Sequence, residues 1–424
     1  MTQEVLAPGI PGITEQDVEA IAANEPAWLQ EQRRAAWRSY ESMDLPDIYD
    51  EEWRRTDVRA LPLDGLQRSA ATTEITLPEE ARNAGVVFAP LRDALDRARG
   101  RLYDTVKPEE WKYLALNAAL WNTGAFLYVP KGVEVTLPLQ MLTTGPDVAG
   151  AALFTRTLVI AEAHSRVALI DESASPDGQK GFVSSAVEIV LGDGAQLEYY
   201  DVNQWGDGVY NFKTMRATLG RDARFTALAA GMGSKLTKMR IDTEMPQAGA
   251  QAQLLGVTFG NGDQHFDYNT LQNHVGNHTI SDLQFKSALT DASSLVWYGI
   301  TRINPTAGGS EANQTSRNML LSDHAKAAPI PILEIQAYDV AKCSHGATAG
   351  PVDENELFYL QSRAIPRKIA EQMLVEGFFA DVIMRIPSER LRSRVTDAVI
   401  AKAGGETATL STEELLADDA PAGQ

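Results

Sequence analysis

The sequence predicts a mainly β protein whose core is a stack of short strands between two helical regions. Three observations support this fold class. From about Val133, short β-branched and aromatic runs alternate with Gly and Asp; one turn pattern recurs there about every 30 residues; and the segments on either side carry helical signals. Repeated strands and turns without intervening helices are typical of a β-solenoid, whose coils bury one another's inner faces.

The composition narrows the classes of function. The 424 residues include 38 basic and 57 acidic side chains, and the net charge of -19 disfavours nucleic acid and anionic membranes as partners. A single cysteine excludes an intrachain disulfide and a metal centre held by several cysteines of this chain. Neither a long apolar run nor the basic and apolar start of a secretory signal is present, so we expect a cytoplasmic protein.

Residues 1–130 are predicted to form an N-terminal helical or mixed domain. Pro26 is expected to open the second of its helices, because proline is favoured where a helix begins. A Trp-containing segment at 45–61 is expected to dock on the next domain, and residues 90–99, PLRDALDRAR, predict another short helix.

Residues 131–350 are predicted to form the solenoid core. The recurring turns each carry a small residue, which suits a crowded corner between strands; these residues are Ser165, Ala195, Ala223, Ala250, Ala292 and Ala325. Successive spacings are 30, 28, 27, 42 and 33 residues, and the long interval predicts an extra or elongated coil. A β-sandwich would also have short strands and turns, but the punctuation repeats in kind as well as in spacing, which favours the solenoid.

Residues 351–403 are predicted to form a C-terminal helical domain. Asp353 and Glu356 have the spacing of a capping box, and Pro366 is expected to open a second helix. Pro387 and Ser388 are expected to start a third helix, and residues 404–424 are expected to be mobile.

The stretch DVAKCSHGATAG carries the candidate chemistry. On a strand, Cys343 and His345 point to the same face, so that two metal-ligand side chains lie side by side. The alternative is that Cys343 packs as a small hydrophobic residue and His345 caps a turn. His265, His274 and His278 lack a regular ligand spacing and are interpreted as structural. The sequence contains neither a P-loop nor the G-x-S-x-G turn of a serine hydrolase.

Residues 331–379, from PILEIQ to EGFF, resemble the SufB/SufD family of iron-sulfur cluster assembly proteins, and weaker similarity extends over most of the chain. Within the family, Cys-Ser-His-Gly-Ala-Thr at 343–348 is similar to the SufD branch. The SufB branch has a glutamate where this chain has Gly346, and its cysteine falls at about Ser316. Ala364 departs from the family pattern, which has Gly at this position.

The resemblance implies a right-handed parallel β-helix and a non-catalytic scaffold subunit of a SufBCD complex. It implies pairing with a SufB-like paralogue through the β-helix and docking of the SufC ATPase on the C-terminal helices. The candidate SufC-binding residues are Phe358, Tyr359, Arg363, Met373, Phe378 and Phe379. His345 and Cys343 would contribute to a transient iron-sulfur cluster at the junction with SufB, and the chain alone would hold no stable cofactor.

Three further interpretations follow from the sequence. An isolated chain would be able to pair with a second copy through the exposed flank of its β-helix. A carbohydrate-active β-helix enzyme is the alternative function, although no closely spaced pair of acidic residues marks a cleft. The third interpretation is a purely structural subunit in which Cys343 and His345 are inert packing residues.

Overall fold

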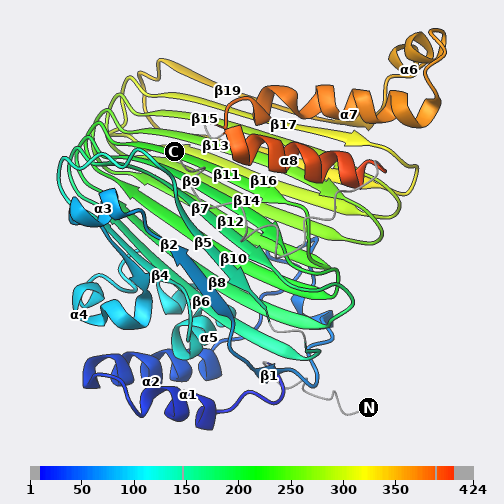
Figure 1. Cartoon of the computed structure of the whole chain (residues 1–424). Helices are drawn as coiled ribbons and strands as arrows, with labels where there is room; N and C mark the ends of the chain where they lie inside the picture. The colour runs from blue at the N-terminus through cyan, green and yellow to red at the C-terminus, as the bar shows by residue number, and fades with distance from the viewer. Residues whose placement is uncertain (1–9, 146–147, 387–388, 405–424) are drawn as a thin grey trace, which may run out of the picture. The chain divides into compact units, whose positions relative to one another are not determined.

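The computed structural model describes residues 10–145, 148–386 and 389–404 (Figure 1). The chain divides into two compact units, with the division between Gly350 and Pro351. The first unit contains two long sheets and the helices of the N-terminal region, and the second contains three helices. The predicted fold class, a mainly β solenoid with helices at both ends of the chain, is confirmed.

Two sheets form the solenoid, and the chain alternates between them. The first sheet contains β4 (Ala125–Val129), β6 (Ala151–Ala161), β8 (Gly181–Leu191), β10 (Val209–Leu219), β12 (Leu236–Met245), β14 (His265–His274), β16 (Ser294–Ile303) and β18 (Lys326–Ile335). The second contains β5 (Leu139–Thr144), β7 (Arg166–Ala174), β9 (Gln196–Gln204), β11 (Arg224–Gly231), β13 (Gln251–Gly260), β15 (Ile280–Leu289), β17 (Glu311–Leu320) and β19 (Lys342–Pro351). Neighbouring strands from β4 to β18 and from β5 to β17 are parallel and one coil apart, which is a solenoid and not a sandwich.

The predicted elongated coil is wrong. Leu236 pairs with His265, which pairs with Ser294, and each step is a regular 29 residues (265 − 236 and 294 − 265). The spacing of 42 arose because Ala250 precedes β13 of the second sheet, whereas Ala292 lies just before β16 of the first. The series of small turn residues therefore combines two different corners of the solenoid.

Left-handed backbone marks one corner of every coil from β6/β7 to β16/β17. The corner residues have φ of 59° at His164, 68° at Gly194, 54° at Asp222, 73° at Gly249, 54° at His278 and 67° at Gly309. Residues with and without a side chain alternate here. A Cβ added at Gly194 would overlap the ring of His164, and one at Gly309 would overlap the ring of His278. Each large corner side chain thus needs a glycine in the next coil.

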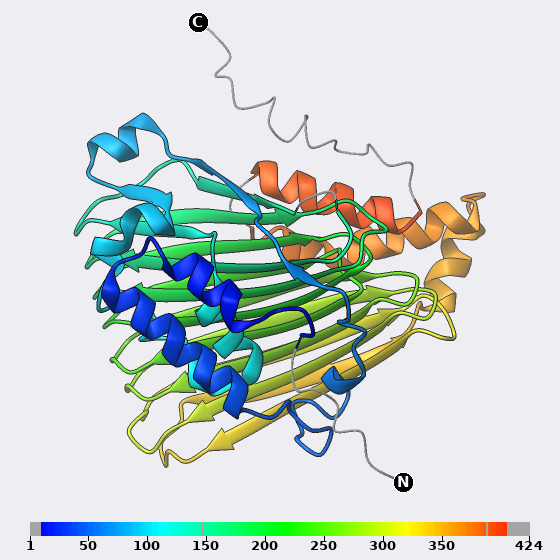
Figure 2. The ribbon, with the colours of Figure 1, turned by 90° about the horizontal axis from the view of Figure 1, so that it is seen from below.

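Helices of the N-terminal region cover the first sheet near its start (Figure 2). The elements are α1 (Glu15–Ala22), α2 (Ala27–Ser42), η1 (Val58–Ala60), β1 (Gln67–Arg68), β2 (Thr72–Thr76), α3 (Glu79–Asn83), β3 (Val87–Pro90), η2 (Leu91–Ala94), α4 (Leu95–Ala98), η3 (Pro108–Glu110) and α5 (Lys112–Leu120). Pro26 caps α2, as predicted, and η2 and α4 lie within the predicted short helix. Helix α5 was not predicted. All nine of its residues are buried, so its sequence shows no polar face.

The Trp-containing segment at 45–61 docks on the first sheet, as predicted. Trp53 packs against Trp111 with ring centroids 4.9 Å apart, and the ammonium of Lys238 on β12 lies 4.5 Å from the Trp53 ring centroid. Lys238 also donates to the backbone oxygen of Glu52 at 2.5 Å. This segment therefore ties the N-terminal region to the middle coils.

The second unit contains α6 (Glu354–Gln361), α7 (Arg367–Ile383) and α8 (Glu389–Lys402). Asp353 caps α6 by accepting a hydrogen bond from the Asn355 amide at 2.8 Å, but no return bond from Glu356 completes the predicted capping box among the described contacts. Pro366 caps α7, as predicted. Pro387 and Ser388, and nearly all of the segment predicted to be mobile, lie outside the described residues.

Ala364 has φ 65°, in the left-handed region, at the junction between α6 and α7. An L-residue with a Cβ is strained there by about 1–2 kcal/mol, part of which Gly would return as extra freedom of the unfolded chain. We expect Ala364→Gly to stabilise the second unit by about 0.5–1 kcal/mol. The matched change Ala380→Gly, at an exposed position inside α7, should destabilise it by about 1 kcal/mol. Chemical denaturation of both variants measures the difference, and equal losses would contradict the prediction.

Candidate functional site

Cys343 and His345 lie on β19, the last strand of the second sheet. Only β17 neighbours β19 in that sheet, so the other edge of β19 has no strand beside it among the described residues. Ser344, between the two, donates to Oδ1 of Asn313 on β17 at 2.9 Å. Since side chains alternate along a strand, Cys343 and His345 share the opposite face.

That shared face is the inner face of the solenoid. Cys343 packs against the buried residues Ile303, Ala307 and Ala312 of the preceding coil. Along β17 the buried side chains are Ala312, Gln314, Ser316 and Asn318, which alternate with more exposed ones. Cys343 is half-buried and His345 is exposed, because β18 and β19 are the last strands of their sheets. The pair thus lies at the end of the solenoid that no further described coil covers, here called the open end.

The thiol of Cys343 favours its neutral form. Burial raises its pKa above the usual range. A thiol must lose its proton before it binds a metal or acts as a nucleophile, so Cys343 needs a nearby positive charge, such as a metal ion, to become a ligand. Within the described part of the chain, no group of three His, Cys, Asp or Glu side chains is arranged to hold a metal ion.

The structure also shows the surroundings of Ser316 and Gly346, the two positions at which the chain differs from the SufB pattern. Ser316 is buried on the inner face of β17 and accepts a hydrogen bond from Asn318 at 3.2 Å. Gly346 has no atom within 4 Å of the position that a Cβ would take. Packing therefore does not require glycine there.

Two of the histidines interpreted as structural, His265 and His274, do have structural hydrogen bonds. His274 is fully buried, and its ring nitrogens lie 2.8 Å from the Thr279 hydroxyl and 2.9 Å from the Ser281 hydroxyl. Burial lowers the pKa of His274 to about 4, so the ring stays neutral at physiological pH. The ring of His265 contacts the hydroxyls of Thr56 and Ser294.

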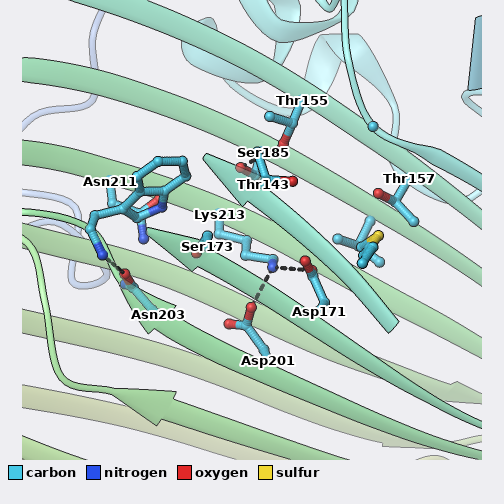
Figure 3. A pocket seen from close by; sticks show the side chains of 14 residues that line it. Thr143, Thr155, Thr157, Asp171, Ser173, Ser185, Asp201, Asn203, Asn211 and Lys213 are labelled. Atoms are coloured by element: carbon cyan, nitrogen blue, oxygen red, sulfur yellow. Dashed lines mark hydrogen bonds and ion pairs between the residues drawn. The ribbon is translucent and has the colours of Figure 1, made fainter. Parts of the chain in front are cut away.

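Sequence reasoning missed a charged cluster inside the solenoid. Lys213 on β10 donates to Asp171 on β7 at 2.7 Å and to Asp201 on β9 at 2.5 Å (Figure 3). Burial raises the pKa of Asp201 to about 6, against the opposing effect of Lys213, while the two carboxylates raise the pKa of Lys213 despite burial. The two aspartates are direct neighbours one coil apart, so a polar residue recurring at the coil spacing was the available signal.

The candidate docking residues in the second unit are only partly on the surface. Phe358 is 72% exposed, Tyr359 is 56% exposed and Met373 is 46% exposed. The guanidinium of Arg363 lies 4.6 Å from the Tyr359 ring centroid and donates to its hydroxyl at 2.6 Å. Phe379 is buried, however, and its ring lies 5.1 Å from that of the partly buried Phe378. Phe379 is therefore removed from the surface that a partner would contact.

Comparison with known proteins identifies the family. The model of the SUF system FeS cluster assembly, SufBD core domain, matches residues 142–378, which is more than half of the chain. The chain belongs to the SufBD family. The match includes most of the solenoid, the stretch with Cys343 and His345, and the first part of the second unit.

Several named members of the SufBD family are similar to the chain. It is 32% identical to the iron-sulfur cluster assembly protein SufD of Bacillus subtilis, over 80% of this chain and 78% of that protein. It is 29% identical to an iron-sulfur cluster assembly SufBD family protein of Mycobacterium tuberculosis, over 85% of this chain and 89% of that protein. It is also 29% identical to the iron-sulfur cluster assembly protein SufB of Bacillus subtilis, over 74% of this chain and 68% of that protein.

Membership of the SufBD family assigns the chain to iron-sulfur cluster assembly by the SUF system. None of the described helices combines the length and the apolar character needed to cross a bilayer.

Proposed function

We propose that the chain is a non-catalytic, SufD-like scaffold subunit of a cytoplasmic SufBCD-type complex, and that it contributes His345 and Cys343 to a cluster assembled at its junction with a SufB-like partner. The observation that carries this proposal is the position of the two side chains on one face of the last strand. An open end leaves the exposed imidazole accessible to a second protein.

The two residues form half of a coordination sphere. Iron-sulfur clusters are usually held by about four protein ligands, so the partner would supply the others. The raised pKa keeps the Cys343 thiol protonated until iron displaces the proton. Such a conditional ligand suits a cluster that is passed on. The purified chain alone is therefore expected to hold no stoichiometric cluster.

Pairing with a SufB-like subunit would use the open end. Among the described residues, β18 and β19 each have a strand on one side only. Edge strands carry backbone groups that can pair with another chain. The similarity to a SufB protein supports a partner built from the same kind of coils. In the absence of that partner, the same surface would allow a homodimer.

Docking of a SufC-like ATPase would use the second unit. Phe358, Tyr359 and Met373 expose large apolar side chains, and such exposed groups often mark protein interfaces. The sequence has no P-loop, so ATP would be handled by the ATPase. Family membership also argues against the carbohydrate-active alternative.

The test is reconstitution of the complex with the SufB-like and SufC-like proteins of the same organism. His345→Ala should reduce the yield of assembled cluster by about tenfold, comparable with losing one metal-site group, while the mass of the complex stays unchanged. Ser344→Ala, on the opposite face, is the matched control and should retain full yield. An unchanged yield in His345→Ala would leave this chain an architectural role only.

The same preparations test docking of the ATPase. The double variant Phe358→Ala/Tyr359→Ala should lose the ATPase on co-purification and still retain the SufB-like subunit. Met384→Ala removes an equally exposed apolar side chain at the end of α7 and should retain both partners. Retention of the ATPase by the double variant would refute this surface.

A further inference from the structure

A small polar cavity lies inside the solenoid beside the charged cluster of Asp171, Asp201 and Lys213 (Figure 3). Its volume is about 20 Å³. Half of the residues that line it carry hydroxyls or amides, including Thr155, Thr157, Ser173, Ser185, Asn203 and Asn211. Such a lining is unusual for the interior of a strand stack, whose inner positions are normally apolar.

Two groups at this cavity have unused hydrogen-bonding capacity. The ammonium of Lys213 has three N–H groups, and its described partners, Asp171 and Asp201, account for two of them. Asn211 is 3% exposed, and its Oδ1 has no hydrogen-bond partner among the described residues. Asn211 and Lys213 are two residues apart on β10, so their side chains project to the same inner face.

An unpaired donor and an unpaired acceptor beside one cavity call for a ligand that both donates and accepts. Buried polar groups are almost always hydrogen-bonded, and those without a protein partner are bonded to ordered water. A cavity needs roughly 10–15 Å³ to hold a water molecule, so this one is large enough for a water. With both aspartates ionised, the cluster carries one net negative charge, which disfavours an anion.

We propose that the cavity binds one ordered water molecule, which accepts the third N–H of Lys213 and donates to Oδ1 of Asn211. The site lies within the first coils, between strands of both sheets, and is separate from the open end with His345. Its water completes the hydrogen bonds of a buried ammonium and so stabilises the charged cluster from inside. This inference is independent of the proposed scaffold function.

Asn211→Leu distinguishes a hydrated cavity from a dry one. In a dry cavity, Oδ1 of Asn211 is an unsatisfied buried acceptor, so Leu should leave the folding equilibrium unchanged or favour it. In a hydrated cavity, Leu removes a partner of the water and should lower the folding equilibrium constant by about tenfold, the typical effect of one lost hydrogen bond. Denaturant unfolding of the full chain measures this change.

Asn203→Leu calibrates the measurement. Asn203 has protein partners, since it donates to Thr237 at 3.2 Å and accepts from the Trp205 amide at 3.1 Å. Its loss should therefore lower the folding equilibrium constant whether or not the cavity holds water. A variant of Asn211 that is as stable as the unchanged chain, or more stable, would overturn the proposal.

A crystal structure of the full chain at high resolution gives an independent outcome. We expect one density peak within hydrogen-bonding distance of both Nζ of Lys213 and Oδ1 of Asn211. The absence of that peak would overturn the proposal, whatever the stability of the Asn211 variant.

Discussion

Lys213→Met is expected to destabilise the chain by about 3–5 kcal/mol, because it removes the cation between two buried carboxylates. Asp171 and Asp201 both contact the Lys213 ammonium, and all three side chains are at most 8% exposed. Without the ammonium, two negative charges would face each other in a medium of low dielectric constant. Chemical denaturation monitored by circular dichroism provides the measurement.

Two further variants separate this effect from simple loss of a lysine. Lys235→Met breaks the exposed ion pair with Asp263 and should cost less than about 1 kcal/mol. The triple change Asp171→Asn/Lys213→Met/Asp201→Asn leaves no charge in this cluster and should recover much of the lost stability. A Lys213→Met variant that is as stable as the Lys235→Met control would contradict the prediction.

Glu188→Leu is expected to destabilise the chain by about 3–5 kcal/mol, because Glu188 is a fully buried anchor for the N-terminal region. Its carboxylate accepts two hydrogen bonds from Arg156, at 2.9 and 2.7 Å. It also accepts hydrogen bonds from the backbone amides of Tyr103, Thr105 and Val106 at 3.0–3.2 Å. Leu would leave the buried guanidinium of Arg156 without its carboxylate partner and three backbone amides without their acceptor.

The control for Glu188 is another Arg-Glu pair of the same unit. Glu134 contacts Arg166 at 3.3 Å, but both side chains are more than half exposed. Glu134→Leu should therefore change the free energy of unfolding by less than about 1 kcal/mol. Limited proteolysis offers a second readout, since loss of the Glu188 anchor should expose residues 103–106 to cleavage. Resistance of this segment, together with unchanged stability, would contradict an anchoring role.

The predicted site depends on a local and a global feature. The placement of Cys343 and His345 on one face follows from their spacing on a strand, which the sequence shows directly. Their exposure does not follow from that spacing. It arises because β18 and β19 end their sheets, so that no further coil covers the pair within the described part of the chain.

The wrong prediction of an elongated coil at the 42-residue interval has a physical cause. Small residues recur at both corners of a solenoid, because each corner is crowded, and a list of small residues alone mixes the two corners. Left-handed residues do not separate them, since Ser234, Gly262 and Asp291 have positive φ at the other corner. The corners differ in which sheet the following strand joins.

The order of residues is enough to recognise the repeated coils, the helices opened by Pro26 and Pro366, and the family that residues 331–379 resemble. These are local properties, set by side-chain alternation, proline geometry and a continuous motif. The folded chain is needed to see that Lys213 lies between two aspartates of different coils, and that Glu188 binds a segment more than 80 residues away. Such contacts depend on the register in which the coils stack, and register is set by the packing of the whole column.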